Sequence, residues 1–315
     1  NIEKIKLSCY ISDIFTKKFI KLIFQATKNY QIAISITFVF IILIPLLSDS
    51  FVDFISGFGV LTLGILHGAN DIKIITKSYK GKLNNLFFKS IMIYVLVVLL
   101  SAVFFFTLPG LALVIFVLFS SYHFGEEHWE DSLSISVANV IFYTLYGAFI
   151  FFLMFTLQYE SVVEVIQMIS GQSLPFYFFL YSSIILGVVL LTLMLLKLST
   201  RNHLFRECLL LLLLTGIFYV GSLWFAFAFY FVVWHSFPSL LNQLKFLYGK
   251  MNFKSFLIYF RHSMIYWLAS LISLYLVYHY VDFEANYFMP LFFSFLAAIT
   301  FPHTIVMFIM KNKNG

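Results

Sequence analysis

Long apolar segments dominate this chain and restrict it to the folds that a lipid bilayer permits. Of its 315 residues, 62% are hydrophobic and only 11% are charged, whereas soluble globular domains have roughly 25% charged residues. A helix needs about 20 mostly apolar residues to cross the hydrocarbon core, where no water is available to bond an open backbone. The sequence therefore predicts an all-α, polytopic integral membrane helix bundle.

Ten apolar segments are predicted to cross the membrane. They run approximately over residues 31–47, 51–71, 87–108, 110–125, 134–157, 176–197, 207–220, 221–241, 256–281 and 288–310. The preceding residues, 1–30, are rich in lysine with interspersed apolar positions, a pattern typical of a basic amphipathic segment on the membrane surface. The chain thus divides into this surface segment and a transmembrane domain over residues 31–315.

Lysine and arginine residues support this count, because they accumulate in cytoplasmic loops. With the first residues inside, ten spans place every basic cluster and both chain ends in the cytoplasm. The external connections around Pro109, Glu160, Gly221 and Asp282 carry no Lys or Arg. The net charge of +6 therefore follows from membrane topology, and no basic groove suggests a nucleic-acid partner.

Four histidines occupy matched positions in four of these segments. His67 lies 16 residues after the start of its segment, His123 lies 13, His235 lies 14 and His303 lies 15. All four segments run from outside to inside in the predicted topology. At a rise of about 1.5 Å per residue, the four imidazoles lie within about one helical turn of the same depth.

Four histidines at one depth predict a metal site. A single intramembrane histidine is more often a packing or hydrogen-bonding residue, but polar groups in the membrane are costly and usually serve function. Imidazole suits iron, zinc or copper, and the lack of thiolate ligands argues against a purely structural zinc site.

Polar neighbours are predicted to support these ligands. Asn70 and Asp71 follow His67 by three and four residues, which on a continuous helix puts them on its face. Glu127, or alternatively Glu126, is predicted to orient a ligand histidine through a hydrogen bond. For all but Glu127, a solvated inner loop is the favoured prediction, and it includes Glu126, His128, Glu130 and Asp131.

The sequences around the histidines resemble a known family in order and spacing. GILHGANDI, SSYHFGEEHW, YFVVWHSFPSL and FPHTIVM are similar to motifs of the Brp/Blh family of bacterial membrane β-carotene 15,15′-dioxygenases, over roughly residues 51–310. The resemblance implies a multi-pass enzyme of the cell inner membrane. Its expected cofactor is Fe²⁺, its substrates are β-carotene and O₂, and its product is retinal, which such enzymes supply to microbial rhodopsins.

The resemblance also assigns roles to individual residues. His67, His123 and His235 match histidines regarded as iron ligands, and His303 in its Pro-His motif is expected to be the fourth. Many members carry a second histidine four positions after the one that matches His235, whereas this chain has Ser239. Ser239 is therefore expected near the iron, where it alters the site or replaces a histidine that was never essential.

Aromatic residues beside the expected ligands are predicted to line a substrate tunnel. The hydrophobic substrate would enter this tunnel laterally from the lipid. They are Tyr122, Phe124, Trp234 and Phe237. Ordinary helix packing is the alternative for each of them.

Two other functions remain open at this stage. A membrane transporter or channel could use intramembrane histidines, but would be expected to place ionisable residues at several depths along a route. Another membrane non-haem iron oxygenase is also possible, although the clustered HxxxH and HxxHH boxes of membrane desaturases and hydroxylases are absent.

Overall fold

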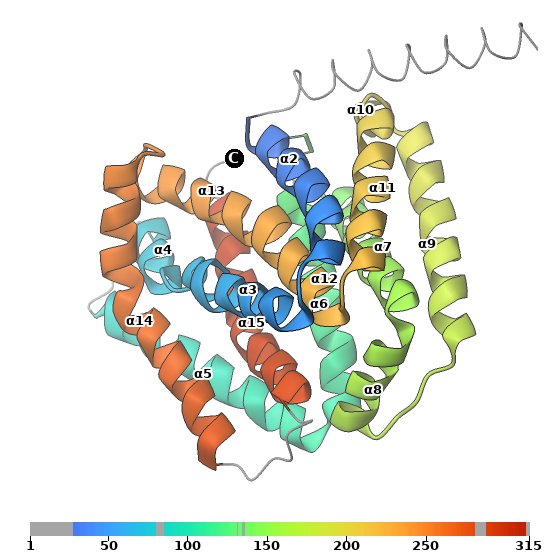
Figure 1. Cartoon of the computed structure of the whole chain (residues 1–315). Helices are drawn as coiled ribbons and strands as arrows, with labels where there is room; N and C mark the ends of the chain where they lie inside the picture. Colours follow the sequence, from blue (N-terminus) through green and yellow to red (C-terminus); the bar gives the residue numbers. More distant parts are fainter. Residues whose placement is uncertain (1–27, 80–84, 131, 134–135, 281–287, 313–315) are drawn as a thin grey trace, which may run out of the picture.

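The chain is a bundle of helices, as predicted (Figure 1). A computed structural model describes residues 28–79, 85–130, 132–133, 136–280 and 288–312, and within these ranges it contains no strand. The predicted surface segment over residues 1–30 lies outside the described residues, except for 28–30. Those three residues begin the first described helix.

The helices vary widely in length and regularity. In chain order they are α2 (Lys28–Leu43), η1 (Ile44–Leu46), α3 (Asp49–Gly59), η2 (Val60–Gly64), α4 (Asp71–Ser78), α5 (Leu86–Thr107), α6 (Pro109–Trp129), α7 (Val137–Leu157), α8 (Tyr159–Ser170), α9 (Phe176–Leu196), α10 (Leu198–Arg201), α11 (Leu204–Val220), α12 (Leu223–Phe229), η3 (Tyr230–Ser236), α13 (Phe237–Tyr248), α14 (Phe253–Tyr280) and α15 (Phe288–Asn312). Here η1 is a 3₁₀ helix, whereas η2 and η3 are π-helices.

Seven helices among the described residues are long and apolar enough to cross a membrane. They are α5, α6, α7, α9, α14, α15 and the continuous run from α12 to α13. The other three predicted spans correspond to shorter pieces, namely α2 with η1, α3 with η2, and α11. The count of ten spans and the cytoplasmic location of both ends remain predictions. Helix α8, in a stretch predicted as an external connection, was not anticipated.

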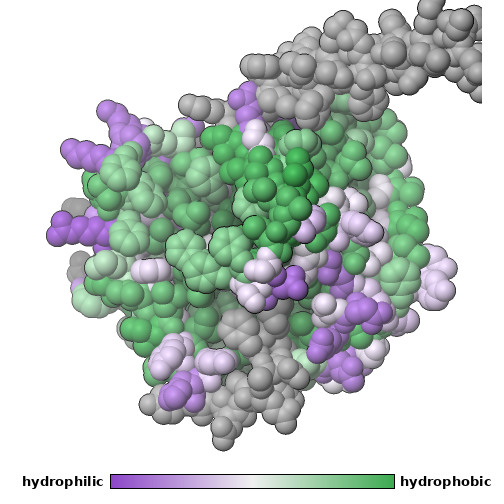
Figure 2. Space-filling view, viewed as in Figure 1, coloured by the Kyte–Doolittle hydropathy of each residue, from purple (hydrophilic) through white to green (hydrophobic). Residues whose placement is uncertain are grey.

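The long helices differ in how much of their surface the protein covers. In an apolar 18-residue window of the run Leu223–Tyr248, 72% of the residues are buried inside the molecule, whereas in the corresponding windows of Leu86–Thr107 and Phe253–His279 only 17% are. Exposed apolar side chains cover much of the surface, as the green areas of Figure 2 show. A surface of this kind is stable in lipid, where apolar side chains need no burial by protein.

Two glycines let α6 and α7 touch through their backbones. A Cβ added to Gly125 on α6 would lie 1.9 Å from the carbonyl oxygen of Tyr143, and one added to Gly147 on α7 would lie 2.0 Å from that of Ser121. Small residues permit this close approach of helices in membranes. The contact fixes the position of His123, two residues before Gly125.

The predicted second span is interrupted. After α3, the chain forms the π-helix η2, passes through a turn at residues 67–70, and resumes as α4 at Asp71. The turn is held by tight backbone hydrogen bonds, such as Gly68 N to Ile65 O at 3.2 Å and Asp71 N to Gly68 O at 3.2 Å. Asn70 and Asp71 therefore do not share a continuous helix face with His67, and that prediction is wrong.

Candidate metal centre

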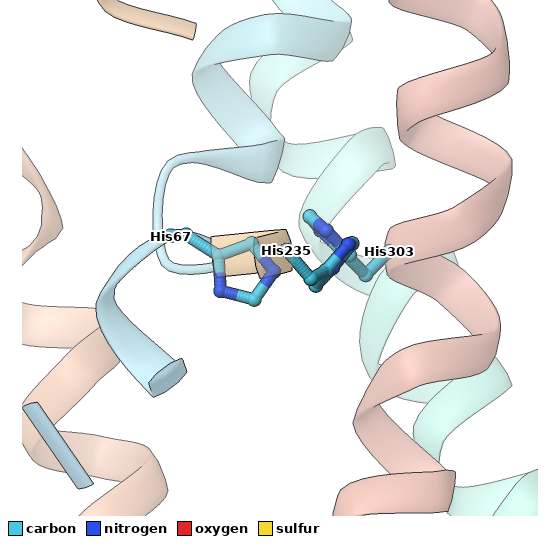
Figure 3. Close-up of side chains that lie close together, drawn as sticks. All are labelled: His67, His235 and His303. Atoms are coloured by element: carbon cyan, nitrogen blue, oxygen red, sulfur yellow. The ribbon is translucent and has the colours of Figure 1, made fainter. Parts of the chain in front are cut away.

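Three histidines from three distant parts of the chain come together at the centre of the bundle. His67 in the turn after η2, His235 in η3 and His303 in α15 offer ring nitrogens that all lie within 4.8 Å of one another. Figure 3 shows the three imidazoles gathered at one point. All three side chains are buried. Among the described residues, these three histidines form a group whose spacing would allow them to hold a metal ion.

His123 on α6 adjoins this group. Its ring centroid lies 4.6 Å from that of His235 and 5.2 Å from that of His303. On the other side, the His67 ring lies 5.1 Å from His235 and 4.7 Å from His303. The four rings thus form a closed circuit in which each contacts two others. His123 is fully buried.

Several nitrogen atoms of these rings make no hydrogen bond among the described residues. They are Nε2 of His67, Nε2 of His303, Nδ1 of His235 and both nitrogens of His123, and all of them are buried. Unsatisfied polar atoms are costly in a protein interior and rare without a reason. The Nδ1 of His67 bonds the carbonyl oxygen of Gly64, so that Nδ1 carries the proton and Nε2 keeps its lone pair. This donor set fits a divalent transition metal.

Asp71 orients His303 rather than His67. The Nδ1 of His303 donates to both carboxylate oxygens of Asp71 at 3.0 Å, and the hydroxyl of Tyr94 donates to the same carboxylate at 2.9 Å. A carboxylate bonded to the far nitrogen of a metal-bound imidazole fixes its tautomer and raises its basicity. Tyr94 was not foreseen, although a tyrosine in an otherwise apolar span was a visible signal.

The turn that carries His67 is fastened to α14. The hydroxyl of Tyr259 lies 2.9 Å from the carbonyl oxygen of His67 and 2.7 Å from Oε1 of Gln243. Asn70 donates to the backbone carbonyl of Tyr259 at 3.1 Å, and this hydrogen bond supports the turn.

Ser239 lies one turn beyond His235 and is fully buried. Its hydroxyl accepts a hydrogen bond from Nε2 of Gln243 at 3.3 Å. Since Gln243 in turn contacts Tyr259, Ser239 belongs to the network that supports the turn of His67. None of its hydrogen bonds in the described structure reaches a histidine.

Glu127 belongs to a charged cluster between helix ends. Lys311 on α15 lies 3.5 Å from a carboxylate oxygen of Glu126, 3.0 Å from Glu127 and 2.7 Å from Glu130. Asn242 on α13 donates to Glu127 at 3.0 Å. Among the described residues, no hydrogen bond or ion pair joins Glu127 to a histidine. Because α6 continues to Trp129 and buries Glu126, the prediction of a solvated loop is wrong for Glu126.

A cavity of about 370 Å³ adjoins the four histidines and is called the first cavity below. All four imidazoles and Asp71 line one end of it, and α5 and α14 line the other. Val95 and Leu99 on α5 and Ala269 and Ser273 on α14 are exposed on the outer surface of the molecule. The cavity therefore reaches from the metal-ligand group toward the lipid.

The predicted tunnel residues lie in different places. Phe124 lines the first cavity, and its ring centroid lies 4.3 Å from that of His235. Tyr122 instead donates to Glu126 at 2.6 Å, and Trp234 donates to Thr37 at 3.0 Å. Neither these two nor Phe237 is among the described residues that line the cavity.

Phe231, which the sequence did not single out, lies beside the histidines. It lines the first cavity, and its ring lies 5.7 Å from His235. A Cβ on Gly64 would lie 2.8 Å from this ring, so the glycine provides its space. Sequence reasoning missed Phe231 because it searched only immediate neighbours of the histidines.

Comparison with known protein families identifies the class of this protein. The family model for beta-carotene 15,15'-dioxygenase matches residues 58–311, well over half of the chain. The chain belongs to this family. No curated protein and no solved structure gives a match. Membership of the beta-carotene 15,15'-dioxygenase family supports a carotenoid dioxygenase, and the matched region contains all four histidines.

Proposed function

We propose that this protein cleaves the central 15,15′ double bond of β-carotene with O₂, using Fe²⁺ held by His67, His123, His235 and His303. The observation that carries the proposal is the circuit of four buried imidazoles with unpartnered nitrogens, at the end of an apolar cavity that reaches the lipid. Family membership supplies the substrate class.

Different side chains would bind the metal, orient a ligand and exclude water. Four neutral imidazoles would hold the ion without reducing its charge, and Asp71 keeps His303 in the tautomer whose Nε2 is free. When bound, the iron supplies the redox chemistry that brings O₂ to an electron-rich polyene. Phe124 and Phe231 cover His235 with aromatic surface and keep water from the reacting carbons.

The reaction needs no acid or base from the protein. The carbon–carbon double bond is broken and replaced by two aldehyde carbonyls, so one β-carotene and one O₂ give two retinal molecules without another co-reactant. Both substrate and product are hydrophobic and partition into lipid, which suits a site that opens within the bilayer. The product retinal can then serve a microbial rhodopsin in the same inner membrane.

The test is expression in β-carotene-producing bacteria, with retinal measured by chromatography and iron measured in the purified protein. Replacement of His67, His123, His235 or His303 by alanine is expected to lower retinal by about a hundredfold or more and to lower bound iron, since removal of a supporting residue alone costs ~10–100-fold. His262→Ala is the matched control, because His262 is exposed. A wild-type protein that yields no retinal and carries no iron would refute the proposal.

A further inference from the structure

A second apolar cavity lies on the opposite side of the aromatic residues that cover His235. It has a volume of about 430 Å³, close to the 370 Å³ of the first cavity. Residues of α6, α7, α8, α9, α12 and α15 line it, and the polar ones are confined to Ser170 and Gln172. Both volumes fall within the roughly 300–1,000 Å³ typical of ligand pockets. Nothing described so far uses the second cavity.

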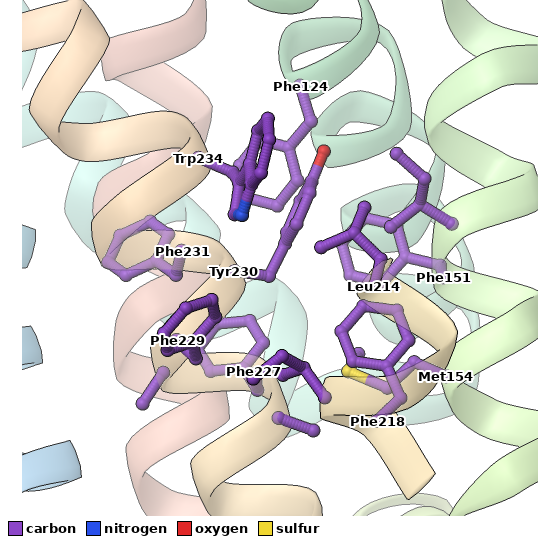
Figure 4. Packing of buried hydrophobic residues seen from close by; sticks show 14 of the residues in the cluster. Phe124, Phe151, Met154, Leu214, Phe218, Phe227, Phe229, Tyr230, Phe231 and Trp234 are labelled. Carbon is purple, nitrogen blue, oxygen red and sulfur yellow. The ribbon is translucent and has the colours of Figure 1, made fainter. Parts of the chain in front are cut away.

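Only two layers of aromatic rings separate the two cavities. Phe124 and Phe231 line the first cavity, whereas Phe151 and Phe227 line the second. The rings are stacked in pairs across the boundary, with centroids 5.4 Å apart for Phe124 and Phe151 and 5.5 Å apart for Phe227 and Phe231. Figure 4 shows these four side chains within one cluster. They are called the aromatic partition.

The aromatic partition lies on the side of the histidines toward which one half of a centrally cleaved substrate would extend. A symmetric carotenoid whose central double bond lies at the histidines extends by an equal half to each side of them. The first cavity runs from the histidines toward α5 and α14 and accounts for one side. On the other side, Phe124 lies against His235 at 4.3 Å, and the second cavity begins one ring beyond it.

The backbone that carries one ring of the partition is irregular. Phe231 belongs to the π-helix η3, which also carries His235. Such segments often occur at functional sites. The second cavity also reaches the lipid-facing surface, because Val114, Leu118 and Phe178 on its lining are 56%, 51% and 44% exposed.

We propose that the second cavity binds the far half of the carotenoid, and that the polyene threads the aromatic partition to reach it. This inference rests on the proposed function. The two retinal molecules then arise in separate cavities, each with its own opening to the lipid. Two openings allow either product to leave without passing the metal-binding histidines.

The test fills the second cavity from α8. Ile166 lines it, whereas Met168 on the same helix is half-buried and does not line it. Ile166→Trp is expected to lower kcat/KM for β-carotene by about tenfold or more, since a tenfold change corresponds to ~1.4 kcal/mol of lost transition-state binding. Met168→Trp is the matched control and is expected to change it less than about threefold.

A shortened substrate separates a blocked cavity from a damaged protein. β-Apo-8′-carotenal keeps the central double bond and one complete half, so its short arm needs less of the second cavity. Ile166→Trp is expected to change its cleavage by less than about threefold, and to lower the amount of β-carotene retained by the purified, metal-free protein. Ile166→Phe is expected to give a smaller loss and serves if the Trp variant fails to fold.

The outcomes distinguish this inference from the function on which it rests. If Ile166→Trp cleaves β-carotene at the wild-type rate, or loses activity equally on both substrates, the second cavity does not hold the far half. If the wild-type protein cleaves neither substrate, the proposed function itself is wrong.

Discussion

The segments that carry His67 and His235 differ from the helices that face lipid in both burial and regularity. Helices α5, α9 and α14 are continuous and 17–22% buried, and they carry mostly apolar side chains. The run from α12 to α13 is 72% buried and contains a π-helix, and the segment with His67 is broken by a π-helix and a turn. Irregular backbone at membrane depth is tolerated only where protein covers it. The covered interior is therefore the part of the bundle where an irregular backbone can bring histidine side chains together.

The first prediction tests the buried interior at the contact between α6 and α7, where the largest effect is expected. Gly125→Ala is expected to abolish accumulation of folded protein, because its Cβ would lie 1.9 Å from the backbone oxygen of Tyr143. Backbone atoms cannot turn aside as a side chain can, and overpacking in a tight core costs about 1–3 kcal/mol or more. Membrane-inserted, monodisperse protein after detergent extraction is the measurement.

Gly187 on the lipid-facing α9 provides the matched control. A Cβ there would meet the ring edge of Phe149 at 3.0 Å, and that side chain can shift. Gly187→Ala is expected to accumulate nearly as the wild type does. Equal loss in both variants would mean that the interior and the lipid-facing layer tolerate change alike, contrary to the comparison.

The second prediction concerns a buried charge in the interior. Asp71→Asn keeps the size of the side chain but removes the negative charge that faces Nδ1 of His303. Loss of such an outer partner typically costs about 10–100-fold in metal affinity or activity, and a loss in that range is expected here. Iron retained during dialysis against a chelator measures the affinity independently of turnover.

Two further variants show how large the effect of Asp71→Asn on iron binding is by comparison. Asp53→Asn, at an exposed position of α3, is expected to bind iron as the wild type does. Tyr94→Phe removes only the hydroxyl bonded to Asp71 and is expected to weaken iron binding by roughly three- to tenfold, in line with ~1 kcal/mol for one hydrogen bond. If Tyr94→Phe were worse than Asp71→Asn, the hydroxyl would have a role other than holding the carboxylate.

The same contrast explains which features the sequence could predict. The long regular spans were placed within a few residues, because hydrophobicity and length alone decide them. His67, His123, His235 and His303 were singled out from depth and motif, and the structure brings their rings together. Counting residues from the start of each segment to its histidine is insensitive to local irregularity, since the four depths need to agree only within one helical turn.

The contacts around the histidines could not be predicted in the same way. Helical spacing paired Asp71 with His67, but the chain unwinds at Gly68 and turns Asp71 toward His303, which lies 232 residues away. The partners of Glu127 are likewise on α13 and α15. Such contacts depend on tertiary packing, and no local period in one sequence contains them.

Ser239 provides the last prediction and the smallest expected effect. It stands where the family resemblance leads us to expect a histidine, yet its hydroxyl accepts from Gln243 and makes no hydrogen bond to the four imidazoles in the described structure. Ser239→Ala is therefore expected to keep retinal production and iron content within about twofold of the wild type. A hydrogen bond as long as 3.3 Å belongs at the low end of the usual range, ~0.5 kcal/mol, which corresponds to about a twofold change. Gln243→Leu, which also removes the contact to Tyr259, is expected to reduce both more strongly, because the turn carrying His67 loses its support. A Ser239→Ala protein that loses its iron would show that Ser239 serves the metal site itself, and that the interior holds one more functional position than its four histidines.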